Sequence, residues 1–307
     1  MTDSAELDTN SGDVALWKGE LEGLDHAVIR VPNLDEAVVW YQQLLGLAVT
    51  ERRPGRVFLA SPVTGRVVLG LVEGGTGLEY VSFRAHSADA FERVLGRLAG
   101  AGVEITRGSE GTRAGASDAL RVSLPTGHLL EVLTAEPEAP NLMEGAHRPG
   151  AFDVRASHIQ FRTTDVAGLT AFLSTFGFKS TTYVQLPDGA YFIQFLRVND
   201  RHHQLAVLTG EPGVHHVALE VGEADFWRFL DNLALYKIPA EFGPARHYDG
   251  KFLSIYVRDP FGNRIEVTGP MEAIGFDTPP HSADQEPWYH MNMWGPQPPQ
   301  SWETEWM

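Results

Sequence analysis

Alternating apolar and polar residues give way to an amphipathic segment at four places along this chain. The first alternating run begins at Leu24 and stops at Pro32, where Asn33 is a suitable N-cap for a following helix. The apolar residues that share one face of this predicted helix are Ala37, Trp40, Tyr41 and Leu44. The same strand-then-helix pattern starts again at Glu79, Ser157 and His215. We therefore expect four copies of one supersecondary unit.

Each copy continues through further strands and closes on an apolar run. These runs read VVLGLV, LLEVL, HQLAVL and RIEVT. Similar turns precede two of them, because Pro125-Thr126-Gly127 and Pro260-Phe261-Gly262 each stand four residues before a glutamate, Glu131 or Glu266. In the first copy, PVTG at 62–65 takes the equivalent place. The pattern predicts an α+β fold of four repeated βαβββ modules.

Pairing the modules two by two predicts two domains joined by a Pro- and Gly-rich linker. The expected parts are an N-terminal extension (1–20), an N-terminal domain (21–135), a linker (136–154), a C-terminal catalytic domain (155–270) and a C-terminal arm (271–307). The arm holds four of the seven tryptophans, six acidic residues and no Lys or Arg. We expect it to be ordered, with its aromatic side chains docked on the body or on a neighbouring subunit.

The amino-acid composition limits the metal ligands and the binding partners that this protein can have. With 24 basic and 40 acidic residues, the net charge of −16 disfavours nucleic acid or an anionic membrane as the main partner. No signal pattern and no apolar run of about 20 residues occurs, so a soluble cytoplasmic protein is expected. Because the chain has no cysteine, thiolate metal sites and thiol nucleophiles are excluded, and any bound metal must use His and carboxylate side chains.

Aligning the two predicted domains on their repeats pairs His26 with His158, Tyr80 with His216, and Glu131 with Glu266. The C-terminal half thus offers two histidines and one carboxylate, a set that holds an iron-class metal and leaves adjacent positions open. The N-terminal half lacks the second histidine, so we expect its metal site to be lost. Neighbouring side chains of a strand face opposite ways, which makes His215 the alternative to His216, and the repeat alignment favours His216.

The stretch GPARHYDGKFLSIYVRDPFGNRIEV carries a more specific signal. With the repeats, it resembles the type I extradiol ring-cleavage dioxygenases of the vicinal oxygen chelate superfamily (catechol 2,3-dioxygenase-like). The resemblance implies Fe(II), with Mn(II) as the alternative, held by His158, His216 and Glu266. It also implies catalytic and substrate-binding roles for His203, His247 and Tyr256, with His203 as the acid–base group. His202 is the alternative to His203, and alternation into the following QLAVL favours His203.

The activity implied by the resemblance is extradiol, or meta, ring cleavage in aromatic hydrocarbon catabolism. A catecholic substrate would chelate Fe(II), and both atoms of O₂ would enter a hydroxymuconic semialdehyde-type product. The family also implies a homo-oligomer. The alternatives are a glyoxalase-like metal-dependent isomerase or transferase of the same superfamily, and a metal-free small-molecule-binding protein of the resistance type. Phe195 and Phe242 fall in stretches expected to line the pocket, which favours an uncharged, substituted catechol.

Overall fold

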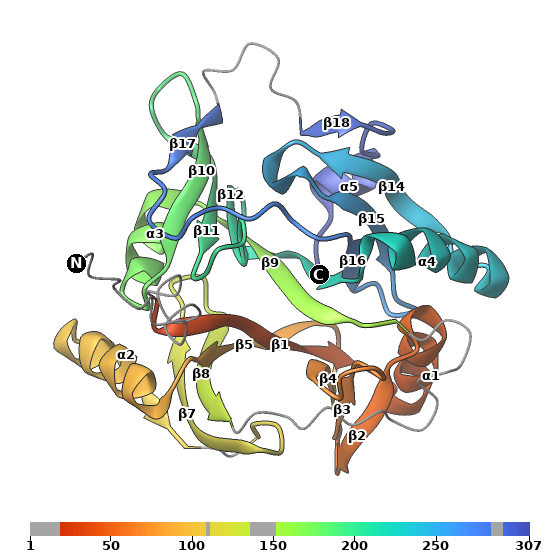
Figure 1. The fold of residues 1–307 in the computed structure, drawn as a ribbon, viewed down its shortest axis with the longest axis horizontal. Coiled ribbons are helices and arrows are strands. Elements are labelled where there is room, and N and C mark those ends of the chain that lie inside the picture. The colour runs from red at the N-terminus through yellow and green to blue at the C-terminus, as the bar shows by residue number, and fades with distance from the viewer. Residues whose placement is uncertain (1–18, 109–110, 136–151, 284–290) are drawn as a thin grey trace, which may run out of the picture.

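Two mixed β-sheets, one from each half of the chain, make up the molecule (Figure 1). The structure is a computed structural model and describes residues 19–108, 111–135, 152–283 and 291–307. Most of the predicted N-terminal extension and of the predicted linker lies outside these residues. In the part of the chain that is described, no helix is long and apolar enough to cross a membrane.

The N-terminal half contains two copies of one unit, a strand, a helix and three strands. The first copy comprises β1 (Leu21–Val31), α1 (Leu34–Leu45), β2 (Ala48–Arg53), β3 (Arg56–Ala60) and β4 (Val67–Glu73). The second comprises β5 (Gly77–Ala85), α2 (Ala88–Gly100), β6 (Thr106–Arg107), β7 (Ala116–Ser123) and β8 (Leu129–Ala135). Their strands form one sheet in the order β2-β3-β4-β1-β5-β8-β7-β6.

The C-terminal half repeats the unit twice more. The third copy comprises β9 (Arg155–Thr163), α3 (Val166–Ser174), β10 (Lys179–Gln185), β11 (Tyr191–Arg197) and β12 (Leu205–Thr209). The fourth comprises β13 (Gly213–Glu220), α4 (Glu223–Tyr236), β14 (Ala240–His247), the short 3₁₀ helix η1 (Asp249–Lys251), β15 (Leu253–Arg258) and β16 (Arg264–Thr268). The predicted α+β fold of four βαβββ modules is confirmed.

Local sequence signals begin and end these elements. The side chain of Asn33 caps α1, because its oxygen accepts hydrogen bonds from two backbone N–H groups of the first turn at 3.1 and 3.2 Å. The helix ends at Gly46, whose φ of 66° lies in the left-handed region that favours glycine. The turns before β8 and β16 pass through Gly127 and Gly262 with φ of 81° and 96°. The repeated turn sequences therefore have a conformational cause.

The two halves share one strand register. In each half, the first strands of the two modules lie side by side and antiparallel, and each pairs in parallel with the last strand of its own module. The equivalent cross-strand partners are His26–Ser82 and His158–Ala218 in the antiparallel pairs, and Ser82–Glu131 and Ala218–Glu266 in the parallel pairs. The alignment of the halves inferred from the repeats therefore holds residue by residue at this place.

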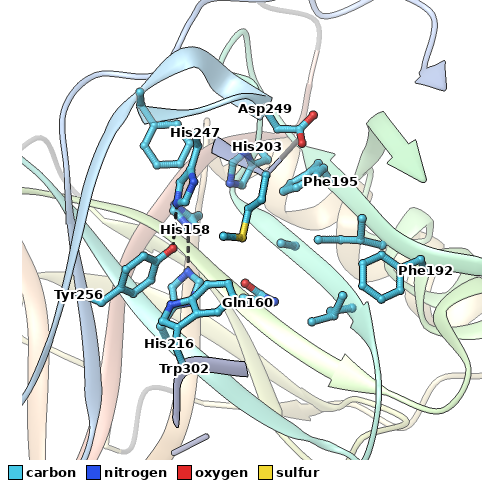
Figure 2. A pocket seen from close by; sticks show the side chains of 15 residues that line it. His158, Gln160, Phe192, Phe195, His203, His216, His247, Asp249, Tyr256 and Trp302 are labelled. Atoms are coloured by element: carbon cyan, nitrogen blue, oxygen red, sulfur yellow. Dashed lines mark hydrogen bonds between the residues drawn. The ribbon is translucent and has the colours of Figure 1, made fainter. Parts of the chain in front are cut away.

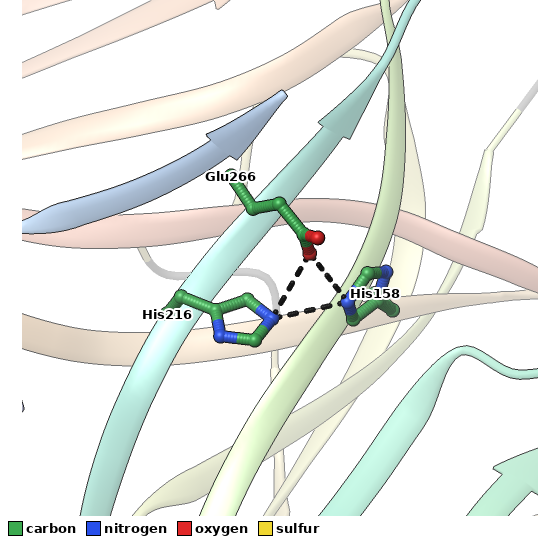
Figure 3. A group of neighbouring side chains, drawn as sticks. All are labelled: His158, His216 and Glu266. Carbon is green, nitrogen blue, oxygen red and sulfur yellow. Dashed lines mark hydrogen bonds and ion pairs between the residues drawn. The ribbon is translucent and has the colours of Figure 1, made fainter. Parts of the chain in front are cut away.

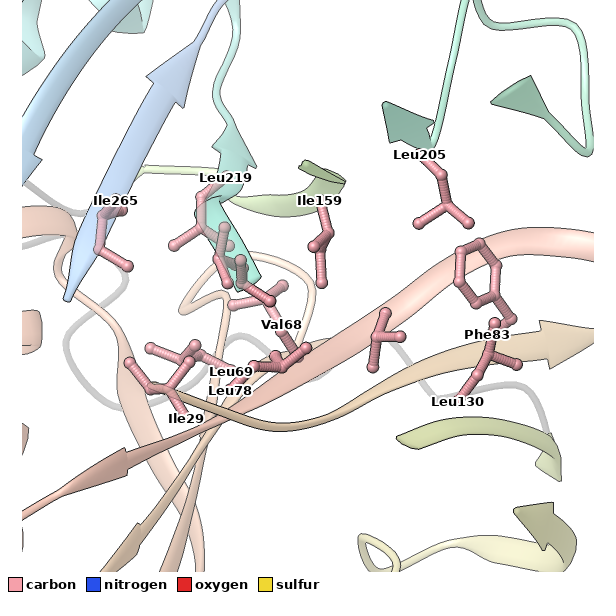
Figure 4. Close-up of a cluster of buried hydrophobic side chains, with 14 of the residues drawn as sticks. Ile29, Val68, Leu69, Leu78, Phe83, Leu130, Ile159, Leu205, Leu219 and Ile265 are labelled. Atoms are coloured by element: carbon pink, nitrogen blue, oxygen red, sulfur yellow. The ribbon is translucent and has the colours of Figure 1, made fainter. Parts of the chain in front are cut away.

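One apolar core lies between the two sheets and joins the halves (Figure 4). Ile29 and Leu69 of the first sheet face Leu219 of the second, and all three are fully buried. Phe83 and Phe178 meet edge to face across the same boundary, with ring centres 4.9 Å apart. Truncating such a side chain to alanine typically costs about 2–5 kcal/mol of stability. The N-terminal half therefore supports the sheet that carries the candidate site.

The C-terminal arm covers both edges of the ten-stranded sheet, whose order is β17-β10-β11-β12-β9-β13-β16-β15-β14-β18. Strand β17 (His281–Ser282) pairs with β10 at one edge, and β18 (Asn292–Trp294) pairs with β14 at the other. Helix α5 (Gln300–Thr304) follows, and Trp302 within it packs on Tyr256 with ring centres 5.5 Å apart. In its described part, the arm docks on the body of its own chain.

Candidate metal centre and adjoining cavity

Three side chains from neighbouring central strands converge on one point (Figure 3). His158 comes from β9, His216 from β13 and Glu266 from β16, which are adjacent in the sheet. The two Nε2 atoms lie 3.0 Å apart, and Oε2 of Glu266 lies 2.9 Å from His158 Nε2 and 3.1 Å from His216 Nε2. All three residues are buried. The structure thus brings together the three residues that the sequence predicts as metal ligands.

The geometry of this trio suits a divalent metal. Ligand atoms that are bound at about 2.1 Å and at right angles to one another stand about 3.0 Å apart, as these three atoms do. Oε2 of Glu266 is buried and has no hydrogen-bond partner among the described residues, which is costly unless a positive charge lies at this point. Two imidazoles and one carboxylate are also the donor set typical of non-haem ferrous sites.

Hydrogen bonds behind Glu266 orient its carboxylate. The hydroxyl of Ser254 donates to Oε1, and Nε2 of His247 lies 3.3 Å from the same oxygen, so Oε2 is the atom that faces the two histidines. Burial raises the pKa of Glu266, but the facing groups of His158 and His216 outweigh this effect and hold the pKa well below its usual range. The carboxylate is therefore an anion.

A chain of hydrogen bonds fixes the tautomer of His216. Its Nδ1 lies 2.7 Å from Nδ1 of His215, and Nε2 of His215 donates to the carbonyl of Trp302 at 2.6 Å. With that proton on His215 Nε2, His215 Nδ1 accepts from His216, which leaves the lone pair of His216 Nε2 for a metal. Burial lowers the pKa of His216 to about 4 against the opposing effect of Glu266, so the imidazole is neutral near pH 7. His215 therefore supports His216 and does not replace it at the centre.

The cavity beside this centre has a volume of about 190 Å³ (Figure 2). The residues that line it are His158, Gln160, Phe192, Ile193, Phe195, His203, Ala206, Leu208, His216, His247, Asp249, Phe252, Tyr256, Met291 and Trp302. Every predicted catalytic residue therefore reaches the cavity that contains the two predicted histidine ligands. Glu266 lies fully buried behind that surface.

His203 lies close to the predicted ligands. Its ring centre is 4.5 Å from that of His158. Its Nδ1 lies 2.9 Å from Nδ1 of His202, whose Nε2 in turn lies 3.1 Å from the hydroxyl of Thr182. Burial lowers the pKa of His203 well below its usual range and lowers that of His202 to about 3. Of the two adjacent histidines, His203 lines the cavity. Strand alternation is not the reason, because both histidines precede β12, and extending the alternation of its lining residues Ala206 and Leu208 would place His202 on this face.

His247 and Tyr256 form a hydrogen-bonded pair on the other side of the centre. The Tyr256 hydroxyl lies 3.0 Å from Nε2 of His247, and Nδ1 of His247 donates to the side-chain oxygen of Asn292 at 2.7 Å. Burial, followed by the charge of Glu266, raises the pKa of Tyr256 well above its usual value, so its hydroxyl stays protonated. Burial lowers the pKa of His247, but the hydrogen bonds to Glu266 and Asn292 and the charges of Glu266 and Asp249 together raise it above its usual value. Both residues are therefore suited to donating hydrogen bonds.

One expectation about the cavity wall is wrong. Phe195 lines the cavity, but Phe242 does not. The ring of Phe242 stacks behind Tyr256, with ring centres 5.5 Å apart and an interplanar angle of 17°, and the ring centre of Trp302 lies 5.3 Å from that of Phe242. Tyr256 lines the cavity and Phe242 does not, so the role of Phe242 is to support the tyrosine ring.

The equivalent place in the N-terminal half is filled by protein groups. Arg121 pairs with Glu131 at 2.7 Å, and the hydroxyl of Thr112 donates to the same carboxylate oxygen at 2.9 Å. The Tyr80 hydroxyl lies 3.4 Å from Nε2 of His26. In strand register, Arg121 stands opposite Glu131 as Tyr256 stands opposite Glu266. A guanidinium group thus supplies the positive charge that the carboxylate needs.

Sequence reasoning missed several residues of this site. Ser254 and Gln160 each stand two residues from a predicted site residue on the same strand, Tyr256 and His158, and strand alternation alone could have placed them on the same face. Trp302 reaches the cavity from the arm. Its tryptophan-rich surroundings predict docking but not the place of docking.

Comparison with known proteins identifies the family. The sequence profile of the Glyoxalase/Bleomycin resistance protein/Dioxygenase superfamily matches residues 23–132 and 155–267. The chain therefore belongs to this superfamily, as its repeats and its His-His-Glu pattern indicate. The two matched ranges correspond to the two pairs of modules.

Individual relatives agree with this assignment. The chain is 27% identical over 267 residues to a manganese-dependent 2,3-dihydroxybiphenyl 1,2-dioxygenase from Geobacillus genomosp. 3, covering 81% of this chain and 85% of that protein. It is 29% identical over 263 residues to a metapyrocatechase from Pseudomonas sp. (strain CF600), covering 79% and 84%. The structure of homoprotocatechuate 2,3-dioxygenase from Brevibacterium fuscum superimposes with a TM-score of 0.82 at 23% identity, covering 95% and 94%. This structural likeness shows the fold.

Proposed function

We propose that this protein is an extradiol ring-cleaving dioxygenase whose C-terminal half is catalytic and whose N-terminal half has lost its metal site. In this proposal His158, His216 and Glu266 hold Fe(II), or Mn(II) as the alternative. The observation that carries the proposal is the convergence of three buried donor atoms, 2.9–3.1 Å apart, at the wall of a small cavity. The dioxygenase relatives support the reaction class.

The metal would supply adjacent open positions for a vicinal diol and O₂, together with a path for electrons between them. The carboxylate of Glu266 and two neutral imidazoles leave one net positive charge at the centre, which a monoanionic catecholate neutralises. Both atoms of O₂ enter the product as the carbon–carbon bond next to the diol breaks, so the reaction needs no external reductant. The product is of the hydroxymuconic semialdehyde type.

His203 is the proposed acid–base residue. Its Nδ1 is engaged with His202, so Nε2 is the atom available to the cavity. In the tautomer proposed for neutral His203, Nδ1 carries the proton and donates a hydrogen bond to Nδ1 of His202. Nε2 of His203 can then accept a proton from a catechol hydroxyl and later return it to an oxygen of the opening ring. In this tautomer, the hydroxyl of Thr182 accepts a hydrogen bond from the Nε2–H group of His202.

His247 and Tyr256 are the proposed hydrogen-bond donors to the substrate and to developing negative charge on oxygen. Tyr256 remains a neutral donor because its pKa is raised by burial. Asn292, from the arm, holds the ring of His247 in place through Nδ1. The arm therefore orients one catalytic residue while Trp302 closes the cavity wall.

Partners and location follow from the same proposal. We infer a small catecholic diol and O₂ as substrates. The net charge of −16 argues against nucleic acid as a partner. Assembly into a homo-oligomer and a cytoplasmic location are further expectations from the family and the composition.

The test is anaerobic reconstitution with Fe(II), followed by addition of catechol and air. We expect about one metal ion per chain and a yellow product that absorbs in the near-visible range. The control is His216→Ala, which should bind no metal and form no yellow product. If the wild-type protein binds no divalent metal, the metal-free binding protein replaces this proposal. If it binds metal but cleaves no catechol in a panel, the isomerase or transferase replaces it.

A further inference from the structure

The cavity has a polar side at the candidate metal centre and an apolar side away from it (Figure 2). The apolar side is formed by side chains from β11, β12 and the arm, namely Phe192, Ile193, Phe195, Ala206, Leu208, Met291 and Trp302. A diol bound at the centre would direct the substituents of its ring toward this wall. The nature of the wall therefore bears on which catechols fit.

The described lining of the cavity also contains an acidic side chain but no Lys or Arg. Among the described residues that line the cavity, none is Lys or Arg, and Asp249 contributes a carboxylate. Gln160 is a neutral polar side chain in this lining and is only 7% exposed. Away from the candidate metal centre, a negatively charged substituent would meet a neutral amide and apolar side chains but no Lys or Arg of the described lining.

Basic residues near the cavity are engaged elsewhere. Arg162 follows Gln160 by two residues on β9 and so projects from the same face of the strand. Its guanidinium lies 4.3 Å from the ring centre of Trp306 and donates to the carbonyl of Glu303 at 3.2 Å. Lys251 lies 3.7 Å from the ring centre of Tyr248. The arm thus holds the cation that β9 would otherwise offer to a substrate.

We propose that this cavity selects uncharged catechols that carry an apolar alkyl or aryl substituent and discriminates against catechols with a carboxylated side chain. The inference rests on the proposed function and names its substrate class. A carboxylate at the apolar wall loses its hydration without gaining a countercharge, which costs binding free energy. An apolar group at the same place is removed from water, which contributes favourable binding free energy. Gln160 offers a neutral hydrogen-bonding group beside this wall.

The experiment compares two catechols of equal heavy-atom number, 4-isobutylcatechol and 3,4-dihydroxyphenylacetate, on the ferrous holoenzyme. We expect both kcat/KM in air and anaerobic affinity by calorimetry to favour 4-isobutylcatechol by about 100-fold. Equal values, or a preference for the acid, would overturn the inference. The two proposals fail separately, since cleavage of no catechol in the panel counts against the dioxygenase while the anaerobic affinities still test the cavity.

A charge inserted at the wall tests where the substituent lies. Phe192 is 42% exposed at the cavity, so Phe192→Arg should fold and should lower the preference for 4-isobutylcatechol by about fivefold or more. Trp227→Arg is the matched control, because Trp227 is 48% exposed on α4 and does not line the cavity. It should leave the preference unchanged. An unchanged preference in Phe192→Arg, or an equal shift in both variants, contradicts the proposed placement.

Discussion

The buried negative charge of Glu266 can be stabilised either by a bound metal ion or by an ion pair with a protonated histidine. The isosteric change Glu266→Gln distinguishes these two explanations. The carboxylate is fully buried, with two imidazole nitrogens within 3.1 Å and one oxygen without a hydrogen bond. If a metal belongs there, the variant loses an anionic ligand, and Fe(II) or Mn(II) no longer stabilises the fold. If the anion belongs to an ion pair, the metal-free protein itself loses stability.

The size of the effect follows from mass action. A metal at 100 times its Kd stabilises a folded protein by about 2.7 kcal/mol, which raises the Tm of a chain of this size by roughly 4 °C. We expect this shift in the wild-type protein and a shift near zero in Glu266→Gln. The difference between metal-loaded and metal-free Tm is the useful quantity, because it cancels any effect of the substitution on the metal-free fold.

The assay is anaerobic calorimetry with and without the metal, with a chelator in the metal-free samples. Glu131→Gln is the internal control, since Glu131 holds the same register position but is bound by Arg121 at 2.7 Å. This control should lose about 1–3 kcal/mol of stability and keep the full metal shift. The reasoning fails if Glu266→Gln keeps the metal shift. It also fails if the wild type shows no shift while the metal-free variant loses the 3–5 kcal/mol expected of a broken buried ion pair.

Three further predictions concern other parts of the molecule. Burial raises the pKa of Glu241, but hydrogen bonds from Arg264 and Arg258 lower it to about 2, so its stabilising effect is present above pH 4.5 and is lost as the pH falls toward 2. Glu241→Gln should therefore reduce the loss of stability between pH 7 and pH 3 by about 2 kcal/mol, measured by urea unfolding; an unchanged acid dependence contradicts this. Tyr41→Phe removes a buried 3.2 Å hydrogen bond between the halves, to Asp259, and should cost about 1 kcal/mol in the same assay. A neutral result would mean that the remaining bonds of Asp259 suffice. Trp302→Ala opens the apolar wall and should raise KM for 4-isobutylcatechol about tenfold while changing KM for catechol less, as steady-state kinetics can check; equal changes would place the substituent elsewhere.

The repeats explain why so much of the fold could be predicted from the chain. Strand alternation, the Asn33 cap and the glycine turns depend on contacts within a few residues, so each leaves a local pattern. The duplication also provides an internal alignment, which singles out His158, His216 and Glu266 although they are far apart in the chain. Their register in the sheet follows from the modules and not from any separate signal.

By itself, the sequence determined the four modules, their pairing in two halves and the chemical identity of the converging donor atoms. Only the tertiary structure decided that Phe242 lies behind Tyr256, that Trp302 closes the cavity, and that Trp306 engages Arg162. The physical reason is range. Local hydrogen bonding and strand alternation leave a pattern in neighbouring residues. The wall of a cavity instead depends on packing between different segments, such as those of Arg162 and Trp306, and this packing has no periodic signature in the chain.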